Sequence, residues 1–464
     1  MPIWSRNFAR TPLILLAIVE VTILFVSVYF ATYVMIGETP LADDFLGPLA
    51  PKASALALVM LMSMIAMGLY QFHQRVYFHE VFARVVVGFV LGSLVLAVAY
   101  YAVPSIGFTP QVAAVSVAIA LVSLSFIRYL FVRNVDENIF RRRTVVYGAG
   151  ERSKAITDLK RRADRRGFRI LGHVPAPGDR TRNDATGVFR DVECLTHFAL
   201  ETGADEIVVA MDDRRGNLPV RQLIDAKLRG VEVIDLVDFM ERETGKIHLD
   251  LVKPGWLIFT PGFRLTRLRQ YSKRTFDVVA STAALLVCWP VMLLVAIAIK
   301  IYDGVDQPII YRQRRVGFHG QPFEVLKFRS MRTDAEKDGT AKWATENDPR
   351  ITRIGHFLRK YRLDELPQVF NVLAGQMSIV GPRPERPEFV RELSRDIPFY
   401  DERHMVKPGV TGWAQLKYAY GSSTEDAKQK LQYDLYYVKN HSLLLDLMII
   451  LQTVEVVLWG KGSR

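Results

Sequence analysis

The chain has 464 residues, of which 50% are hydrophobic, and its formal net charge is +12. So much apolar sequence predicts a membrane-embedded part rather than an ordinary soluble protein. Only Cys194 and Cys288 are present, far apart, which excludes a disulfide framework and a cysteine-based metal site. The positive charge favours an anionic partner, whether nucleic acid, anionic lipid or a phosphorylated substrate.

Four apolar stretches near the N-terminus approach or exceed the about 20 residues that a membrane-spanning helix needs. They run approximately over residues 13–36, 53–70, 81–103 and 112–131. No small-residue cleavage site closes the first run, so we expect a membrane helix rather than a removed signal peptide. Arginines gather in the second loop and after the fourth stretch, whereas the first loop is acidic and the third uncharged. The positive-inside rule therefore predicts that both ends of this bundle face the cytoplasm.

From residue 144, short β-branched runs alternate with amphipathic stretches. Strands are predicted at 144–150, 169–174, 205–211 and 230–236, with helices at 153–164 and 218–229. This alternation is typical of a small parallel α/β module of the Rossmann-like type. Its turn "GAGERS" has Gly148 and Gly150, but Ser153 stands where a dinucleotide fingerprint would have its third glycine. Nucleotide binding and a purely structural or regulatory role both remain open for this module.

A further apolar region, residues 275–302, carries Pro290 near its middle and basic residues on both flanks. Proline removes a helical hydrogen bond and kinks the chain, and matched positive flanks favour one side of the membrane for both ends. We therefore expect a re-entrant hairpin that enters the membrane and returns, with a fifth crossing or a buried soluble helix as alternatives. The apolar stretch 442–459 is interrupted by acids and predicts a helix that lies on the membrane surface or packs on the domain.

Residues 311–420 are rich in arginine, lysine, glycine and proline and contain an adjacent acid pair, Asp364 and Glu365. Two neighbouring carboxylates repel each other unless positive charge accompanies them. Guanidinium groups bind phosphate oxygens in a bidentate manner, and carboxylates near phosphates favour a bridging Mg²⁺. We therefore expect a diphosphate site in which the acid pair holds Mg²⁺ and five cationic side chains bind phosphate: Lys327, Arg329, Arg359, Arg383 and Arg386. Solvated or lipid-binding arginines, and a helix-capping acid pair, are the alternatives.

Five segments, in order along the chain, resemble a known family: "KRTFDVV", "YRQRRVG", "KFRSM", "LDELPQVFNVLAGQMSIVGPRPERPEF" and "VKPGVTGWAQ". They are similar to motifs of the bacterial sugar transferases, the monotopic polyprenyl-phosphate phosphoglycosyl transferases, over roughly residues 270–463. In the first 250 residues the resemblance, to the large form of the family, is architectural only. The implied architecture is a four-span membrane α-helical bundle (1–135), a Rossmann-like α/β module (136–250) and an α/β monotopic catalytic domain with a re-entrant membrane helix hairpin (251–464).

The resemblance implies transfer of a hexose-1-phosphate, with glucose or galactose as the sugar, from a UDP-sugar to undecaprenyl phosphate, releasing UMP. It implies that Asp364 is the nucleophile that forms a phosphosugar-enzyme intermediate, and that Glu365 assists metal binding or proton transfer. The implied partners are UDP-sugar, undecaprenyl phosphate and membrane lipid, and no nucleic acid; the sequence leaves the oligomeric state open, with a homodimer as one option. The implied location is the bacterial cytoplasmic (inner) membrane, with the catalytic domain on its cytoplasmic face, in exopolysaccharide or O-antigen synthesis.

Two other classes of function account for part of the sequence. A membrane-tethered nucleotide-sugar dehydratase or epimerase needs a Tyr-x-x-x-Lys motif and a complete glycine fingerprint, and the sequence has neither. A non-enzymatic membrane sensor or scaffold explains the net charge of +12 but not an acid pair set among rigid glycine-proline turns.

Overall fold

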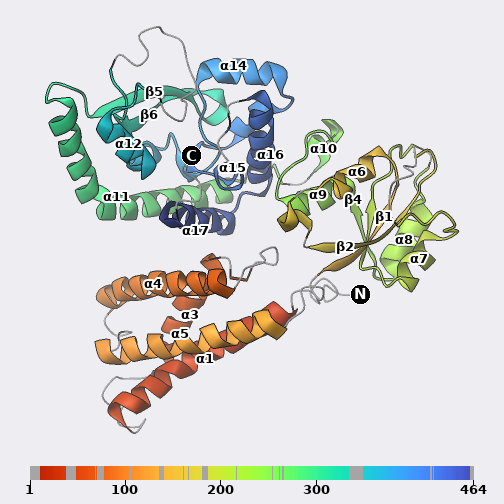
Figure 1. Ribbon diagram of the computed structural model, residues 1–464, viewed down its shortest axis with the longest axis horizontal. Coiled ribbons are helices and arrows are strands. Elements are labelled where there is room, and N and C mark those ends of the chain that lie inside the picture. The colour runs from red at the N-terminus through yellow and green to blue at the C-terminus, as the bar shows by residue number, and fades with distance from the viewer. Residues whose placement is uncertain are drawn as a thin grey trace. The chain divides into compact units, whose positions relative to one another are not determined.

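The computed structural model describes residues 11–37, 49–67, 69–70, 78–103, 107, 109–134, 141–159, 161–165, 167–179, 187–215, 217–252, 254–260, 262–263, 266–333, 348–418, 421 and 423–459. The chain forms two compact units, Met1–Thr244 and Gly245–Arg464, which we call the N-terminal and C-terminal units. The first contains a helical bundle and a parallel sheet, and the second contains the acid pair (Figure 1). The three-part division at residues 135 and 250 stays a prediction.

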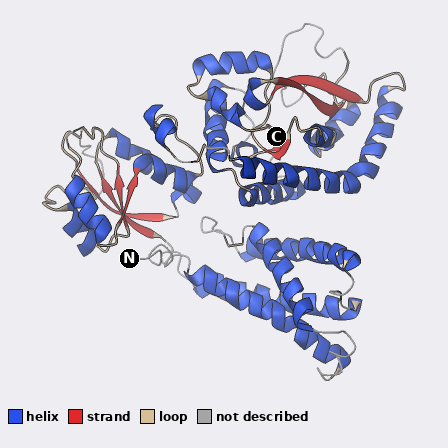
Figure 2. Ribbon diagram, turned by 180° about the vertical axis from the view of Figure 1, so that it is seen from behind, coloured by secondary structure: helices blue, strands red, loops and turns tan. Residues whose placement is uncertain are grey.

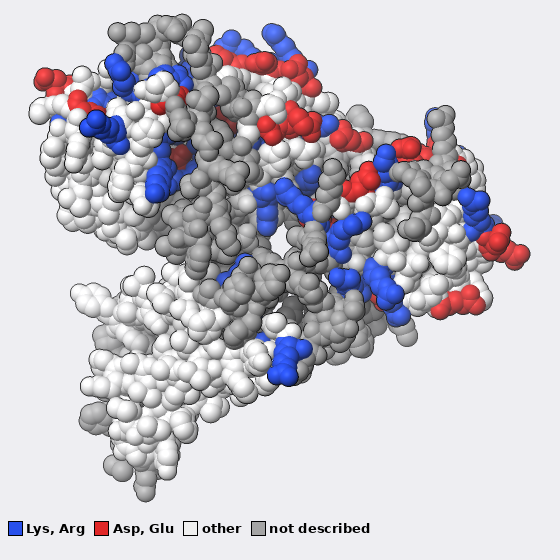
Figure 3. Space-filling view, in the orientation of Figure 1, with Lys and Arg blue, Asp and Glu red and all other residues white. Residues whose placement is uncertain are grey.

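The helical bundle consists of α1 (Thr11–Ile36), α3 (Leu49–Ala66), α4 (Phe78–Ala102) and α5 (Pro110–Asn134). Its leucine, methionine and alanine side chains fill a shared core, and many other apolar side chains point outward. On the face that Figure 3 shows, the described residues of the bundle carry almost no charge. Apolar groups on both the inner and outer faces suit helices surrounded by lipid.

Four helices among the described residues are long and apolar enough to cross a membrane. Their apolar spans are Ile14–Ile36, Arg84–Tyr101, Pro110–Arg133 and Arg267–Asp303. The expected second span, 53–70, is different in the structure, because α3 ends at Ala66 and its apolar part is the shorter Leu49–Ile65. The acidic loop 38–48 and most of the second loop, which set the predicted orientation, lie outside the described residues, so that orientation stays a prediction.

A buried ion pair joins the first and last helices of the bundle. Arg128 Nε lies 2.7 Å from Glu20 Oε1, and both side chains are almost fully buried. Tyr70 also donates to Glu20, while Arg128 Nη1 donates to the Leu69 carbonyl at 3.1 Å. Charged side chains in an apolar helix bundle are tolerated when they satisfy one another in this way, so this cluster fixes α1 against α5.

The α/β part of the N-terminal unit has a four-stranded parallel sheet in the order β2-β1-β3-β4. Its helices lie on both faces of the sheet (Figure 2). The predicted alternation of strands and helices is confirmed, although the first helix is shorter than expected, because α6 ends at Thr157 and a separate 3₁₀ turn follows it. The elements are β1 (Arg142–Tyr147), α6 (Glu151–Thr157), η4 (Arg162–Arg165), β2 (Phe168–Val174), α7 (Leu195–Glu201), β3 (Glu206–Val209), α8 (Val220–Leu228), β4 (Glu232–Asp235) and α9 (Leu236–Thr244).

The turn "GAGERS" between β1 and α6 is closed by carboxylates of the chain itself. The Ala149 amide donates to Asp179 at 2.8 Å, and the Glu151 and Arg152 amides donate to Asp212 at 3.1 and 2.8 Å. In a dinucleotide site the corresponding amides bind phosphate. Because the acids already occupy these donors, the turn supports the structural interpretation of the module rather than nucleotide binding.

The C-terminal unit combines helices with two small sheets, an antiparallel β5–β6 ribbon and a parallel β7–β8 pair. Its elements are α10 (Pro254–Phe259), α11 (Arg267–Asp303), β5 (Ile310–Val316), η5 (Phe318–Gly320), β6 (Pro322–Phe328), α12 (Arg353–Lys360), η6 (Leu363–Glu365), α13 (Gln368–Leu373), β7 (Ser378–Val380), α14 (Pro387–Asp396), η7 (Tyr400–Met405), β8 (Gly409–Thr411), α15 (Trp413–Lys417), α16 (Thr424–Asn440) and α17 (Leu443–Trp459). The first half of α17 packs on this unit through Leu445 and Ile449.

Helix α11 is a single 37-residue helix with Pro290 inside it. Figure 1 shows that it runs in two legs with a bend between them, as a proline within a helix produces. In the first leg, Asp277 accepts hydrogen bonds from the Ser378 hydroxyl at 2.9 Å and the Ile379 amide at 3.1 Å. At the far end, Arg329 Nη2 lies 3.2 Å from Asp303 Oδ2. Both legs are therefore held by the same compact unit.

Two residues of the basic flank before α11's apolar part make specific contacts with the C-terminal unit. Lys273 Nζ lies 2.7 Å from Asp446 Oδ2 and donates to the Val380 carbonyl at 3.1 Å. Arg274 donates to the Val372 and Leu373 carbonyls at 2.6 and 2.7 Å. These side chains fasten the helix to α13, β7 and α17, a role that their charge alone did not reveal.

Glycines allow the β7 and β8 segments to touch backbone to backbone. A Cβ on Gly409 would lie 2.1 Å from the Gly381 nitrogen, and a Cβ on Gly412 would lie 2.2 Å from the Gly381 oxygen. Such approaches leave no room for a side chain. The glycines of "GPRP" and "KPGVTGW" therefore fix the start of the loop that carries Arg383.

Candidate active site

The acid pair lies on η6, a 3₁₀ turn between α12 and α13. Arg362, the residue before this turn, has the left-handed φ of 54°, which is costly for a residue with a side chain. Pro367 then caps α13 with a φ of −63°, a value that proline adopts without strain. The left-handed Arg362 before the turn and the rigid Pro367 after it hold Asp364 and Glu365 in a short turn. The side chains of the two acids have different surroundings there.

Glu365 is surrounded by three cations. Its carboxylate lies 2.8 Å from Arg383, 3.4 Å from Lys327 and 3.7 Å from Arg362. Burial alone would raise the pKa of Glu365, but Arg383, Lys327 and Arg362 outweigh it and hold that pKa well below its usual range. Glu365 is therefore a fixed anion. Arg362 belongs to the basic run that precedes the acid pair, but the sequence did not single it out as a site residue.

Asp364 has a different environment. Its side chain is buried, and no other described residue donates a hydrogen bond to its carboxylate. Burial and the neighbouring Glu365 charge raise its pKa above the usual range, although Lys327, Arg359 and Arg383 oppose this rise. Neighbouring carboxylates whose pKa values are shifted in opposite directions are typical of catalytic acid pairs. Among the described residues, the pair thus consists of one carboxylate held in ion pairs, Glu365, and one without a hydrogen-bond partner, Asp364.

Three of the five predicted phosphate-binding cations lie near this pair. Lys327 and Arg383 both contact Glu365, and burial lowers the pKa of the Lys327 amine. Arg359 acts electrostatically on Asp364, and its Nη1 is buried without a hydrogen-bond partner among the described residues. A buried guanidinium nitrogen without an acceptor is costly, so Arg359 has a donor to offer a phosphate oxygen.

The other two predicted cations have different contacts. Arg329 is buried and pairs with Asp303 at 3.2 Å and with the Gln307 side chain at 3.1 Å, so it fixes the end of α11. Arg386 immediately precedes α14 and lies 3.6 Å from Glu388. Their assignment to phosphate binding stays a prediction.

The loop that carries Arg383 is held by two arginines that the sequence did not single out as functional. Arg403 is buried, lies 2.7 Å from Asp434 and donates to the Arg383 carbonyl at 2.9 Å. Arg315 donates to the Pro384 carbonyl at 3.1 Å. These contacts keep the Arg383 backbone in place, so its guanidinium reaches Glu365 from a rigid loop.

The residues of the site fit a divalent cation only in part. The described residues contain no cluster of three His, Cys, Asp or Glu side chains that could hold a metal ion. Mg²⁺ needs few protein ligands, since it is bound by one or two carboxylates together with water and substrate phosphates. Asp364, whose carboxylate has no hydrogen-bond partner in the part of the chain that the structure describes, fits such a ligand. Glu365 does not, because three cations already surround its carboxylate.

The long apolar helices indicate a membrane protein, and its C-terminal unit contains a buried acid pair set among arginines. Residues 268–460 match the model of the family described as bacterial sugar transferase. A relative from Rhizobium leguminosarum bv. phaseoli, named exopolysaccharide production protein PSS, is 44% identical over 200 residues, which cover 41% of this chain and 97% of the relative. The chain belongs to the bacterial sugar transferase family.

Two longer relatives match more of the chain. A UDP-N-acetylgalactosamine-undecaprenyl-phosphate N-acetylgalactosaminephosphotransferase from Aeromonas hydrophila is 39% identical over 247 residues, covering 53% of this chain and 56% of the relative. A UDP-glucose:undecaprenyl-phosphate glucose-1-phosphate transferase from Escherichia coli (strain K12) is 36% identical over 295 residues, covering 62% of this chain and 61% of the relative. The chain thus spans a little over half the length of these two relatives.

Proposed function

We propose that this protein transfers a hexose-1-phosphate from a UDP-sugar to undecaprenyl phosphate and releases UMP, in exopolysaccharide or O-antigen synthesis. The names of two relatives support this class of substrates, and the name of a third supports exopolysaccharide production. The observation that carries the proposal is the asymmetry of the acid pair. Asp364 has no hydrogen-bond partner among the described residues, whereas Glu365 is held by three cations beside it.

The proposed reaction has two displacement steps at one phosphorus atom. An Asp364 carboxylate oxygen attacks the phosphate next to the sugar, the bond from that phosphorus to the bridging oxygen breaks, and UMP leaves with the electron pair. A phosphate oxygen of the lipid then attacks the same phosphorus and displaces the Asp364 carboxylate. The products are undecaprenyl-diphosphate-sugar and the free enzyme.

Arg383, Lys327 and Arg359 supply positive charge where these steps gather negative charge. Glu365 holds Arg383 and Lys327 in position at 2.8 and 3.4 Å, so their orientation is set before substrate binds. Mg²⁺, bound by Asp364 and the substrate diphosphate, would neutralise further phosphate charge. The burial of the acid pair keeps water away from an intermediate that water would hydrolyse.

We further propose that α11 is re-entrant, with the bend at Pro290 and with the C-terminal unit on the cytoplasmic face of the cytoplasmic membrane. The support is that Asp277 and Asp303, near the two ends of α11, both bind the same unit. A straight crossing would place these two contacts on opposite sides of the membrane.

Thiol labelling tests this topology in a protein whose two native cysteines are replaced by serine. Leu268→Cys and Val305→Cys introduce thiols at exposed positions on either side of α11's apolar part. Both should react with an impermeant reagent in inverted vesicles and neither in intact cells. Val103→Cys, at the predicted outer end of α4, is the control that should react from outside. Labelling of position 268 or 305 in intact cells would contradict the re-entrant arrangement.

The activity itself is tested with the full chain in detergent or lipid. UMP should form when the protein is mixed with Mg²⁺, undecaprenyl phosphate and the right member of a panel of UDP-sugars, and lipid-linked sugar diphosphate should appear in equal amount. A panel containing UDP-glucose, UDP-galactose and their N-acetylated forms covers the sugars named for the relatives. Absence of UMP with every member would refute the proposed function.

A further inference from the structure

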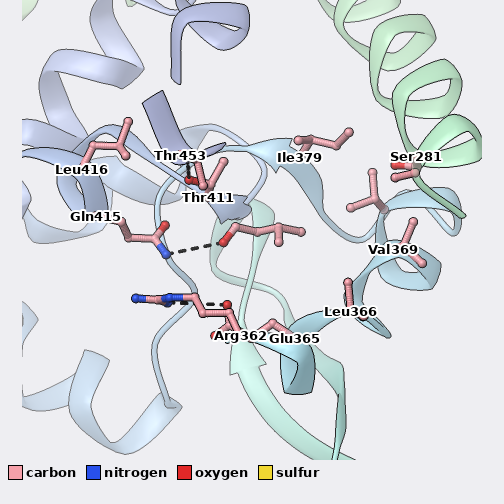
Figure 4. Close-up of a pocket in the computed structure, with 13 residues that line it drawn as sticks. Ser281, Arg362, Glu365, Leu366, Val369, Ile379, Thr411, Gln415, Leu416 and Thr453 are labelled. Atoms are coloured by element: carbon pink, nitrogen blue, oxygen red, sulfur yellow. Dashed lines mark hydrogen bonds and ion pairs between the residues drawn. The ribbon is translucent and has the colours of Figure 1, made fainter. Parts of the chain in front are cut away.

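An apolar cavity of about 270 Å³ opens beside the acid pair (Figure 4). Among the described residues that line it, the charged ones are Glu365 and Arg362, which face it from one place. The uncharged polar ones are Ser281, Thr411, Gln415 and Thr453, and none of the described lining residues is aromatic. Most of the remaining wall is aliphatic and comes from η6 and α13, β7, β8 and α15: Leu366, Val369, Val372, Ile379, Val410 and Leu416.

Small residues of α11 form the opposite wall of this cavity. Ser281 and Ala284 are one helical turn apart, in the leg that precedes Pro290. Ser281 is 1% exposed and its hydroxyl has no hydrogen-bond partner among the described residues. Ala284 is exposed, and Leu286 and Val287, just beyond it, are 70% and 75% exposed. The cavity therefore reaches from the acid pair to the apolar outer surface of α11.

The chemistry of this wall favours a branched hydrocarbon over the other parts of the two substrates. A uracil ring would need a stacking surface, and a sugar would need several hydrogen-bonding groups that are not already paired. The Thr411 and Thr453 hydroxyls of the wall bond to each other, and the Gln415 amide donates to the Val410 carbonyl. The volume of about 270 Å³ admits a short branched segment of hydrocarbon but not the whole of a long lipid chain.

We propose that this cavity binds the first isoprene units of the lipid acceptor. The lipid phosphate then lies at the charged end beside Arg362 and Glu365, and the rest of the chain leaves past Ala284 into the bilayer. The assignment rests on the proposed function, because it needs a polyprenyl phosphate as the second substrate. It adds the place where that lipid is recognised and the reason why α11 carries small residues at positions 281 and 284.

Cavity-filling substitutions test this assignment. Ala284→Phe and Ser281→Leu should each raise KM for undecaprenyl phosphate at least tenfold. The lipid-free half-reaction, one UMP released per active site from UDP-sugar alone, should keep its wild-type rate and amplitude, which also shows that each variant is folded. Val287→Phe adds the same ring to an exposed position of α11 outside the cavity and should leave KM unchanged.

Short acceptor analogues give a second readout. Geranyl phosphate, with two isoprene units, should inhibit turnover more strongly than decyl phosphate, whose ten carbons are unbranched. Ala284→Phe should abolish this preference. If the wild-type protein releases no UMP from any UDP-sugar, with or without undecaprenyl phosphate, the proposed function fails. If wild type turns over but Ala284→Phe matches Val287→Phe in KM, or the two analogues inhibit equally, the cavity assignment is wrong while the function stands.

Discussion

Asp364→Asn is expected to abolish both turnover and the covalent phosphosugar adduct. The amide that replaces the carboxylate is a poor nucleophile. The substitution also removes the one carboxylate of the pair that has no hydrogen-bond partner among the described residues. Turnover should fall by at least about 10³-fold, the scale expected when a nucleophile is removed. The measurement uses UDP-sugar labelled in the phosphate next to the sugar, incubated with the enzyme alone, followed by mass spectrometry of the peptide that contains residue 364.

The control for this substitution is Asp401→Asn, which removes an exposed carboxylate, 72% accessible, from the same unit. It should keep wild-type turnover and adduct formation. A folded Asp364→Asn protein that released UMP at near wild-type rate would rule out the nucleophile assignment. Asp364 would then serve as a ligand for Mg²⁺ during direct attack by the lipid phosphate.

Asp364→Asn should also make the folded protein more stable near neutral pH. Burial raises the pKa of Asp364 in the folded state, so the charged form is disfavoured there relative to the unfolded chain. The contribution of Asp364 to the stability of the folded state is therefore fully present below the pKa of this group in the unfolded chain. It is lost as the pH rises through the higher pKa of the folded state. Asn removes this penalty. The half-unfolding temperature of Asp364→Asn in detergent should therefore exceed that of wild type at pH 7, and the difference should shrink as the pH is lowered.

The sequence was enough to select candidate residues for this site, but not to predict their contacts. Composition and adjacency were enough to single out Asp364 and Glu365, because two neighbouring acids need nearby cations. They could not distinguish the two acids. The distinction depends on the left-handed Arg362 and on which side chains reach Glu365 from β6 and from the loop after β7.

Tertiary contacts also explain what the sequence did not show about the arginines. Arg329 and Arg383 look alike in sequence, since both are arginines in a motif that resembles the family. In the structure the end of β6 meets the end of α11, so Arg329 pairs with Asp303, whereas Arg383 pairs with Glu365. In the membrane part, the approximate helix positions could be predicted from hydropathy, because lipid imposes a minimum apolar length. The end of α3 at Ala66 could not be predicted in this way.

Glu365→Gln is expected to impair turnover and stability together. The neutral amide leaves Arg383 and Lys327 without their shared anion, so both lose the position from which they would stabilise phosphate charge. Turnover should fall by about 10²–10³-fold, comparable to the loss of a preorganised electrostatic group. Removing one member of a buried ion cluster should also lower the free energy of unfolding by about 3 kcal/mol. Steady-state UMP release and unfolding in detergent measure the two effects.

The pH dependence of stability separates the effect of Glu365→Gln from the effect of Asp364→Asn. The cations hold the pKa of Glu365 below its unfolded value, so its stabilisation is present above the unfolded pKa and is lost only as pH falls through the much lower folded pKa. The stability difference between wild type and Glu365→Gln should therefore stay constant from pH 6 to pH 8. Asp364→Asn removes the same charge one residue away, yet its effect on stability should have the opposite sign.

This opposition is the sharpest test of the site, because the two substitutions are chemically matched and adjacent. If both variants lost stability equally, Asp364 would also be paired in the folded protein, and its role as the free nucleophile would lose its physical basis. If Glu365→Gln kept full stability and activity, the three cations around Glu365 would be held by other groups. With the signs as predicted, Glu365 is the anion that holds the arginine and lysine side chains in place, and Asp364 is the carboxylate kept free to react.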